Sequence, residues 1–169
     1  TFFAEIENFT RLAPLSGGFI KKDEKFFEVN QAFICDSTFL EIFDCNLLVG
    51  NPENILDNPG SLIISESFAN KVFGIENPIV KILTLPAGQN DEESKDFTVK
   101  GIMKDFLNNS HLHPDFITSS LDKSIFKRWA WTYLMLKKNA NPQNIESRFK
   151  EFVASISEKE ASEINMEAH

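Results

Sequence analysis

Apolar residues near the start of the chain recur every three or four positions. Phe2, Ile6, Phe9 and Ala13 follow this spacing, with polar residues between them. Such a period places side chains on one side of a helix. The pattern therefore predicts an amphipathic first helix. It should end before Pro14, because the residue preceding a proline disfavours helical geometry.

Three more helices are predicted where a residue that favours helix starts precedes an apolar stripe. The expected caps are Asp36, Ser65 and Asn141, and Pro142 suits the first position of the last helix. Gly74 is placed to end the helix that Ser65 begins. The stripes consist of Phe39, Leu40 and Phe43, then of Phe68, Ala69, Val72 and Phe73, and last of Ile145, Phe149, Phe152, Val153 and Ile156.

Runs of β-forming residues between turn-forming residues predict strands in the rest of the chain. The expected strands cover residues 18–22, 25–35, 61–64, 80–85, 97–104, 116–119 and 129–136. The first two flank Asp23-Glu24 and are predicted to form a hairpin. Residues 51–60 are expected to be a turn-rich loop, residues 87–95 a polar hairpin tip and residues 121–127 a short helix.

The apolar positions within these strands predict which face of a sheet they occupy. In the second strand one face is expected to hold Phe27, Val29, Phe33 and Cys35. In the strand over 97–104 one face is expected to hold Phe97, Val99 and Met103, leaving the other in water. Residues 129–136 are apolar on both faces, as in a central strand. Helices and strands neither alternate strictly nor segregate, which predicts an α+β fold with mixed, mostly antiparallel sheets.

Composition and charge narrow the class of protein. Phe occurs 17 times in 169 residues, which predicts an aromatic-packed core because Phe needs no hydrogen bond when buried. The net charge is −8, and no cluster of Lys and Arg is large enough to neutralise phosphates, so nucleic acid is excluded as a partner. No window approaches the ~20 apolar residues of a membrane span. The chain starts at Thr1 within an apolar segment, so we expect it to be part of a longer protein.

Two places in the sequence suggest chemistry. His111, His113 and Asp115 are spaced as metal ligands can be, but the turn-forming residues before them also suit a loop whose imidazoles bond to the backbone. Ser65 lies where a strand leads into a helix, which is where hydrolases place a nucleophile. Its neighbours are not the small residues that such a tight turn needs, and a helix cap explains the position.

The remaining candidates are weaker. Cys35 and Cys45 allow a disulfide, although two buried thiols suit the sequence better. Trp129 and Trp131 share a strand face, which suits packing or stacking on a sugar or lipid. No glycine-rich phosphate-binding motif occurs. We therefore expect no catalytic residue, no cofactor and no metal site, and predict that the chain is not an enzyme.

Two segments resemble a known family. Ile64–Gly74 reads ISESFANKVFG and is followed by ENPIVK, whereas Phe97–Asp105 reads FTVKGIMKD and is followed by NSH at residues 109–111. In this order they resemble the MacB-like periplasmic core domain, which lies between the first two membrane helices of ABC-transporter permeases of the MacB/FtsX type. The resemblance extends from about Glu5 to Val153.

The resemblance implies that the motif residues specify turns and helix ends and carry no chemistry. These residues are Ser65, Glu66, Gly74, Asn77, Pro78, Asp105, Asn109, Ser110 and His111. Two positions depart from the family pattern, since Val80 stands where Gly is usual and Leu107 where Pro is usual. Each departure relaxes a turn preference and leaves the expected fold unchanged.

The resemblance also implies an organisation and a function. One lobe would consist of residues 1–45 and 96–160, a second would be inserted over residues 46–95, and residues 161–169 would be a polar tail. The domain would be non-catalytic and periplasmic, and would couple ATP-driven motion of membrane helices to substrate or partner handling outside the membrane. Its partners would be the membrane helices of the parent permease, a cytoplasmic ATPase subunit or domain, and a periplasmic partner or substrate. A ligand-sensing extracytoplasmic domain of a membrane receptor is the alternative, and a secreted metal-dependent hydrolase a more distant one.

Overall fold

The computed structural model describes residues 3–15, 18–86 and 94–167. The chain forms two compact units, one of Thr1–Phe9 with Leu134–His169 and the other of Thr10–Tyr133. Both ends of the chain therefore belong to the same, smaller unit. The lobes predicted from the resemblance, with an insertion over residues 46–95, stay a prediction.

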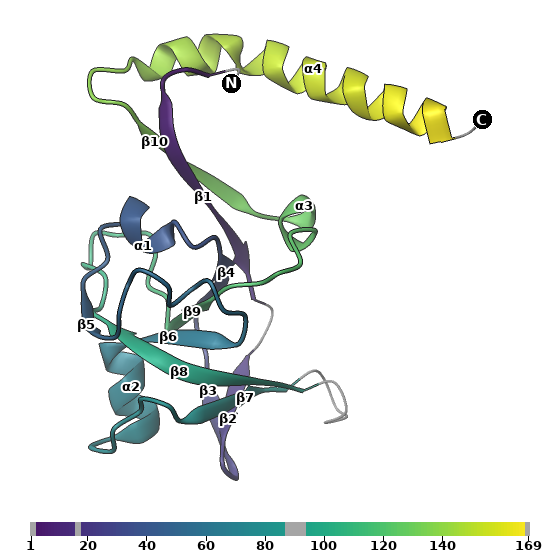
Figure 1. Ribbon diagram of the computed structural model, residues 1–169. Coiled ribbons are helices and arrows are strands. Elements are labelled where there is room, and N and C mark those ends of the chain that lie inside the picture. Colours follow the sequence, from purple (N-terminus) through teal and green to yellow (C-terminus); the bar gives the residue numbers. More distant parts are fainter. Residues whose placement is uncertain (1–2, 16–17, 87–93, 168–169) are drawn as a thin grey trace. The chain divides into compact units, whose positions relative to one another are not determined.

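Ten strands form one sheet in the described part of the chain. They are β1 (Ile6–Pro14), β2 (Phe19–Lys22), β3 (Lys25–Glu28), β4 (Ala32–Cys35), β5 (Leu47–Val49), β6 (Ser61–Ser65), β7 (Ile82–Leu85), β8 (Lys95–Met103), β9 (Phe116–Thr118) and β10 (Trp131–Leu136). Their order in the sheet is β10-β1-β4-β9-β6-β8-β7-β2-β3, and β5 pairs with β8 (Figure 1). The pairs β4–β9 and β6–β8 are parallel, and the sheet is otherwise mostly antiparallel.

Four helices accompany the sheet. They are α1 (Phe39–Ile42), α2 (Glu66–Phe73), α3 (Ile125–Arg128) and α4 (Pro142–Glu167). Helix α2 packs beside β6 and β8 (Figure 1). Helix α4 continues through most of the predicted polar tail. These elements confirm the predicted α+β class with a mixed, mostly antiparallel sheet.

The central strands of the larger unit are buried on both faces. Along β6, Leu62 and Ile64 belong to one hydrophobic cluster and Ile63 belongs to another, and all three are fully buried. Because successive side chains of a strand point to opposite faces, the two clusters lie on opposite faces of the sheet. Phe68 and Phe116 pack in the first cluster and Phe39 in the second, which confirms the predicted Phe-rich core.

Strand β8 carries an irregularity that changes the predicted faces. Leu62 pairs with Val99, but the next residue, Ile63, pairs with Gly101, so β8 has one extra residue at this point. A bulge of this kind shifts the following side chains to the other face. Val99 and Met103 are both buried as predicted, yet they belong to different clusters. The prediction that they share one face, with the other face in water, is therefore wrong.

The predicted first helix is also wrong, because residues 6–14 form strand β1. Thr10 and Leu12, two positions apart, are fully buried, whereas Phe9 is 46% exposed. This period of two is typical of a strand. Pairing of Leu12 with Cys35 in β4 decides the conformation, since a few apolar residues at helical spacing do not outweigh a partner strand.

The long strand predicted over residues 25–35 divides into two. Strand β3 ends at Glu28 and pairs with β2, which confirms the hairpin, whereas β4 begins at Ala32 and pairs with β1 and β9. Asn30 donates its backbone N–H to the Asp115 carboxylate between them. Val29 consequently joins the first cluster and Phe33 the second, so the predicted common face does not exist.

The predicted cap of α1 is wrong, although the helix itself is present. Thr38 occupies the cap position and makes no side-chain cap hydrogen bond. The carboxylate of Asp36 instead accepts hydrogen bonds from the backbone N–H and the guanidinium of Arg11. Two charge-assisted bonds from one Arg are stronger than a neutral cap bond, so they take the carboxylate.

Strand β10 is at the edge of the sheet, and the prediction of a central strand is wrong. Within the described strands it neighbours only β1. Its apolar residues remain partly exposed, and Trp131 is 45% exposed. A run of apolar residues indicates burial on both faces only when partners cover them. Helix α3 occupies the end of the region predicted to be a short helix.

The other predicted elements are present. The loop over 51–60 consists of turns, β6, β7 and β9 match their predicted positions closely, and Ser65 caps α2. Most of the hairpin tip predicted at 87–95 lies outside the described residues, but Leu85 in β7 pairs antiparallel with Lys95 in β8.

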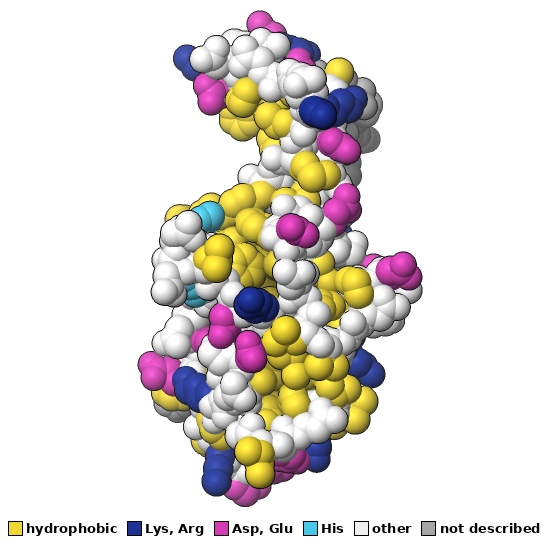
Figure 2. Space-filling view, turned by 90° about the vertical axis from the view of Figure 1, so that its left-hand side faces the viewer, with side chains coloured by type: hydrophobic (Ala, Val, Ile, Leu, Met, Phe, Trp, Pro, Cys, Tyr) yellow, Lys and Arg dark blue, Asp and Glu magenta, His cyan; other side chains and the backbone are white. Residues whose placement is uncertain are grey.

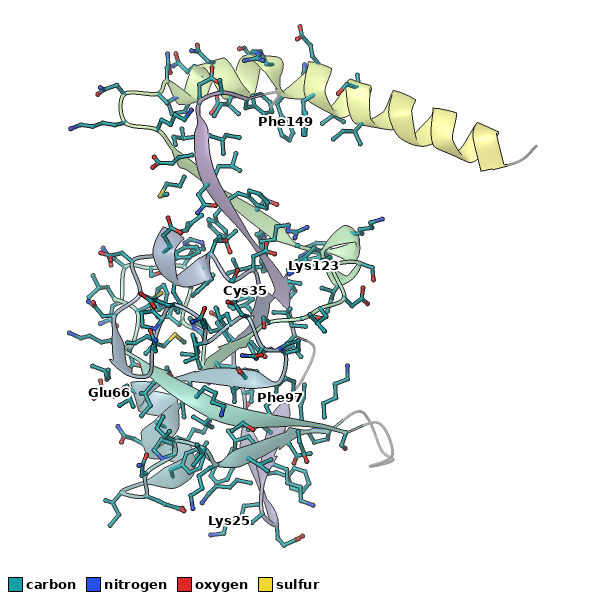
Figure 3. The ribbon with its side chains drawn as sticks, viewed as in Figure 1. Lys25, Cys35, Glu66, Phe97, Lys123 and Phe149 are labelled. Atoms are coloured by element: carbon teal, nitrogen blue, oxygen red, sulfur yellow. The ribbon has the colours of Figure 1, made fainter. Side chains whose placement is uncertain are left out.

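The smaller unit is built around α4. Asn141 accepts the backbone N–H of Gln143 at the start of the helix, as its predicted capping role requires. Ile145 is buried, and the ring of Phe152 contacts that of Phe3 edge-on at 5.2 Å between centroids. Phe149 is 52% exposed and projects from α4 in Figure 3.

Candidate functional site

The two motif segments meet at the first turn of α2. The Ser67 hydroxyl donates to Asp105 Oδ1 at 2.9 Å, and the Ser67 backbone N–H reaches the same oxygen at 3.2 Å. A carboxylate is favourable here because the first turn of a helix has free N–H groups and a positive dipole end. The sequence identified Asp105 but not its partner Ser67, which only the fold brings within reach.

Ser65 acts as the helix cap that its position predicts. Its Oγ accepts the backbone N–H of Phe68 at 3.2 Å and lies 3.3 Å from Ser67 Oγ. The side chain is buried, and its backbone N–H donates to the Asp115 carbonyl. These contacts account for Ser65 structurally and give it no general base among its hydrogen-bond partners.

The remaining motif residues of the first segment shape the exit from α2. Gly74 follows the helix with φ of 59°, a left-handed value that glycine adopts without strain. The Asn77 side chain accepts the backbone N–H of Ile79 at 3.0 Å, forming a tight turn, and Pro78 is buried. Glu66 is exposed in the first turn of α2 and points outward in Figure 3.

A polar corner lies beside the start of α2. The Asp115 carboxylate accepts the Asn30 N–H at 2.6 Å, and the Asp115 N–H donates to the Gln31 carbonyl at 2.8 Å. The Gln31 side chain accepts the backbone N–H of His113 at 2.8 Å. A hollow of about 380 Å³ opens here and is lined by Asn30, Gln31, Ser67, Asp105, Phe106, Asn108, His113, Pro114 and Asp115.

A second hollow, of about 430 Å³, shares Asp105 and Phe106 with the first. It is lined by Phe43, Asp44, Cys45, Asn46, Lys104, Asp105, Phe106, Leu107, Asn109 and Ser110. Ser110 accepts the Leu112 N–H and donates its own N–H to the Leu107 carbonyl, which closes a turn. Leu107, which replaces the family's usual Pro, is exposed at this turn.

His111 is engaged by an aromatic partner. Its Nε2 lies 2.6 Å from the Tyr133 hydroxyl, and the two rings stack with centroids 5.8 Å apart. Burial raises the pKa of Tyr133, whose ring also packs edge-on against Phe43. The sequence did not identify Tyr133, because it lies 22 positions from His111.

The histidine pair is not arranged as a metal site. In the residues that the structure describes, no group of three or more His, Cys, Asp or Glu side chains is placed to share an ion. Histidine atoms, drawn in cyan, do not form one continuous patch on the face shown in Figure 2. Asp115, the third predicted ligand, binds Asn30 instead.

Two ion-pair networks in the larger unit lower the pKa values of their carboxylates. Hydrogen bonds from Lys81 and Lys22 lower the pKa of Glu76 to about 2. Burial raises the pKa of Asp36, but the hydrogen bonds and positive charge of Arg11 outweigh burial and hold it below its ordinary value. Arg11 lies 25 positions from Asp36 and Lys22 lies 54 positions from Glu76, so spacing alone did not reveal these two contacts.

Both cysteines are free thiols, as the sequence favoured. Cys35 is buried, and Figure 3 shows it inside the larger unit. Burial raises the pKa of Cys35 well above its ordinary value and that of Cys45 to about 12. Thiols of this kind are poor nucleophiles because little thiolate is present.

Val80 has an unusual backbone conformation. Its φ is 61°, nearly the same as that of Gly74. A β-branched residue is strained at this angle. Val80 lies where the family usually has Gly, and Gly is the residue that accepts a positive φ without strain.

The sequence matches the family described as the MacB-like periplasmic core domain over residues 3–152. No curated protein matches the chain. Among the described residues, no helix has both the length and the apolar character needed to cross a membrane.

Three solved structures resemble the fold. A domain of a permease protein from Porphyromonas gingivalis has a TM-score of 0.73 and 20% identity, covering 88% of this chain and 64% of that one. The periplasmic region of MacB from Actinobacillus actinomycetemcomitans has a TM-score of 0.67 and 15% identity, covering 91% and 69%. The extracellular domain of the noncanonic ABC-type transporter YknZ from Gram-positive bacteria has a TM-score of 0.60 and 16% identity, covering 85% and 71%. The chain thus spans less than two thirds of the first of these.

Proposed function

The chain belongs to the family of MacB-like periplasmic core domains, and from this premise we propose that it passes motion of membrane helices to substrate or partners outside the membrane. It is the periplasmic domain of a MacB-like ABC-transporter permease. The coupling would begin in the cytoplasm, where an ATPase subunit or domain of the whole transporter hydrolyses ATP. The membrane helices of the parent permease would carry the motion outward.

The position of the two chain ends supports this role. Thr1–Phe9 and Leu134–His169 belong to one compact unit. Within it, the Lys137 N–H donates to the Glu5 carbonyl at 2.9 Å, and Phe3 packs against Phe152. Membrane helices attached at both ends would therefore act on a single packed body, so a displacement of either helix would move the same unit.

The motif residues would serve this body as structural elements and not as a catalytic site. Ser65, Ser67 and Asp105 bind one another or the backbone at the start of α2. His111 binds Tyr133, and Ser110 closes a turn. Side chains held in this way keep fixed positions, which suits a domain that transmits force. The proposed role is accordingly non-catalytic.

The proposal is tested by loosening the attachment of the domain in the parent permease. A flexible Gly/Ser linker of about ten residues inserted at each end of the domain should leave ATP hydrolysis intact but abolish transport, because such a linker behaves as a random coil and carries little force. The same linker placed within the exposed residues 51–53, ahead of the buried Ile55 and Leu56, is the matched control and should leave transport unchanged. Transport that persists with both terminal linkers would refute mechanical coupling.

A further inference from the structure

A hollow of about 560 Å³ lies in the larger unit where several strands of the sheet begin or end. It is bordered by the end of β9, the end of β7 and the start of β8, where Phe97 is labelled in Figure 3. The residues that line it all lie within Thr10–Tyr133, so its lining does not involve the smaller unit. It is larger than the two hollows beside the motif residues and shares no lining residue with them.

The wall of this hollow is mainly apolar. Phe97 belongs to the first hydrophobic cluster, and Leu15 and Leu85 pack against that cluster. Ile34 and Ile125 extend the apolar wall, and apart from Phe97 these side chains are only partly buried. Sites for small molecules are typically hollows of roughly 300–1,000 Å³ with apolar walls and a few polar groups. A molecule that covered this wall would remove apolar surface from water, which favours binding.

Ser119 adds an unpaired polar group to this wall. The residue is 9% exposed, and its Oγ makes no hydrogen bond within the described part of the chain. The adjacent hydroxyls are paired, since Thr118 Oγ1 donates to the Ser61 carbonyl at 2.7 Å and Ser120 Oγ accepts the Asp122 N–H at 3.1 Å. Burying an unpaired hydroxyl is unfavourable, so a ligand that bonded to it would gain affinity. Because Ser119 lines the hollow, rotation about its Cα–Cβ bond can present the hydroxyl to such a ligand.

The charged residues of the lining favour a neutral ligand. Lys95 and Asp96 have opposite charges, and both are exposed. Asp96 already accepts a hydrogen bond from the Thr84 hydroxyl at 2.6 Å. A charged group that entered as far as Ser119 would lose its hydration and would meet an uncharged hydroxyl there, which is costly. An uncharged polar group meets no such cost.

We propose that this hollow binds a neutral amphiphile, a small molecule with an apolar chain and one hydroxyl or carbonyl group. The chain would lie against the apolar wall, and the polar group would form a hydrogen bond with Ser119. Such a ligand would cover the open side of the first cluster and pair the unpaired hydroxyl. The inference goes beyond the proposed mechanical role and does not depend on it, because its test involves neither ATP nor transport.

The probe is octan-1-ol, titrated into the purified 169-residue chain with ¹³C-labelled Ile and Leu methyl groups. We expect saturable chemical-shift changes in NMR spectra at the methyl groups of Leu15, Ile34, Leu85 and Ile125, which line the hollow. Leu107 is exposed and lines the second hollow beside the motif residues, so its methyl groups are the internal control and should not shift. Octanoate and octylammonium carry the same chain length with a charged group, and each should bind about tenfold more weakly.

A pair of serine variants tests the polar contact. Ser119→Ala removes the unpaired hydroxyl and should weaken binding of octan-1-ol about fivefold. Its stability in urea should stay the same or rise, because the chain loses no hydrogen bond of its own. Ser120→Ala is the matched control, since the Ser120 hydroxyl is already paired with the Asp122 N–H, and it should leave the affinity unchanged.

A third variant tests the hollow itself. Ile34→Phe places a larger side chain in the hollow and should abolish binding. Phenylalanine suits a strand, and among the described residues Ile34 is outside both hydrophobic clusters, so the core stays intact. Unchanged methyl spectra away from residue 34 would show that the variant keeps the fold.

Each other outcome overturns the proposal. Equal shifts at Leu107, or shifts that do not saturate, would mean that octan-1-ol contacts apolar surface without a site. Octanoate or octylammonium binding as tightly as octan-1-ol would assign the hollow to a charged ligand. Unchanged affinity in Ser119→Ala, or a large loss of its stability, would make Ser119 a structural residue only. Binding that survives Ile34→Phe would place the ligand elsewhere, and this variant decides the matter if Ser119→Ala does not fold.

Discussion

Helices α2 and α4 have apolar stripes of the same kind but different surroundings. In α2, Phe68 is 1% exposed because the stripe packs against the sheet, whereas Phe149 in α4 is 52% exposed. Both helices begin at a residue whose side chain accepts a backbone N–H. The difference shows that an amphipathic pattern predicts a helix reliably but does not say how completely the rest of the chain covers it.

The largest expected effect on stability comes from shortening one Phe side chain in the apolar stripe of each helix. Phe68→Ala should lower the free energy of unfolding by about 4 kcal/mol, because it leaves a cavity in the first cluster. Phe149→Ala should lower it by less than about 1 kcal/mol, since half of that ring is already in water. Urea denaturation of both variants measures the difference. Equal losses would show that α4 is as deeply packed as α2.

Removing the cap of either helix should lower stability by a similar amount, although the two apolar stripes are buried to different extents. Ser65→Ala and Asn141→Ala each remove an acceptor from the first turn of a helix and should each cost about 1 kcal/mol. The measurement is again urea denaturation, with Ser65→Asn and Asn141→Ser as variants that retain a capping oxygen. A much larger loss in Ser65→Ala than in Asn141→Ala would mean that burial of Ser65, and not capping, sets its contribution.

Polar side-chain contacts other than the caps should contribute more to the stability of α2 than to that of α4. Asp105→Ala removes the acceptor of two hydrogen bonds at the start of α2 and should cost about 1 kcal/mol. Arg148→Ala in α4 removes a partly buried 3.7 Å ion pair with Glu5 and a cation–π contact with Phe3 at 5.4 Å, and should cost about 0.5 kcal/mol. Asp105→Asn, which keeps one acceptor oxygen, should recover part of the loss. No loss in Asp105→Ala would remove the structural role proposed for the joined motifs.

The exit from α2 allows a stabilising change. Val80→Gly should raise the free energy of unfolding by up to about 1 kcal/mol, because relief of strain at a φ of 61° exceeds the added chain entropy of glycine. Gly74→Val, at almost the same angle, should do the opposite. Thermal denaturation of the two variants tests the pair, and destabilisation in Val80→Gly would show that Val80 is held by its side chain.

The smallest expected effect is on acid sensitivity near the end of α2. The pKa of Glu76 is lowered to about 2, so its contribution to stability is present above the ordinary glutamate pKa and is lost as pH falls towards 2. NMR titration of the Glu76 carboxyl measures the pKa directly. In Lys81→Met the pKa of Glu76 should move up towards its ordinary value, because the hydrogen bond from Lys81, which lowers this pKa most, is gone. An unchanged value would assign the shift to Lys22.

The sequence predicted elements well where local signals agree. Ser65, the stripe after it and Gly74 together define both ends of α2, and the hairpin around Asp23-Glu24 has its own turn signal. Prediction from the sequence failed where pairing with a distant strand decides the conformation of a segment. Residues 6–14 form a strand because β4 pairs with them, and Trp131–Leu136 lies at the edge because, among the described strands, only β1 neighbours it.

The candidate site was predictable only in part, for a related reason. Capping and turn residues such as Ser65, Asn77 and Ser110 act on nearby backbone, so their spacing reveals them. The contacts Ser67–Asp105 and His111–Tyr133 join side chains 38 and 22 positions apart. No local pattern specifies such distances. The motif order identified the family, but the partners within the motifs emerged only from the fold.

The position of β1 between β4 and β10 sets an order for folding. β4 follows β1 closely in the chain, but β10 is the last of the described strands, with helix α4 after it. One side of β1 therefore stays unpaired until nearly all of the domain has emerged, and closing so long a loop makes this step slow. A chain delivered from its N-terminus would expose that side to other chains for most of its synthesis. A chaperone would protect the nascent domain most effectively by covering this unpaired side of β1.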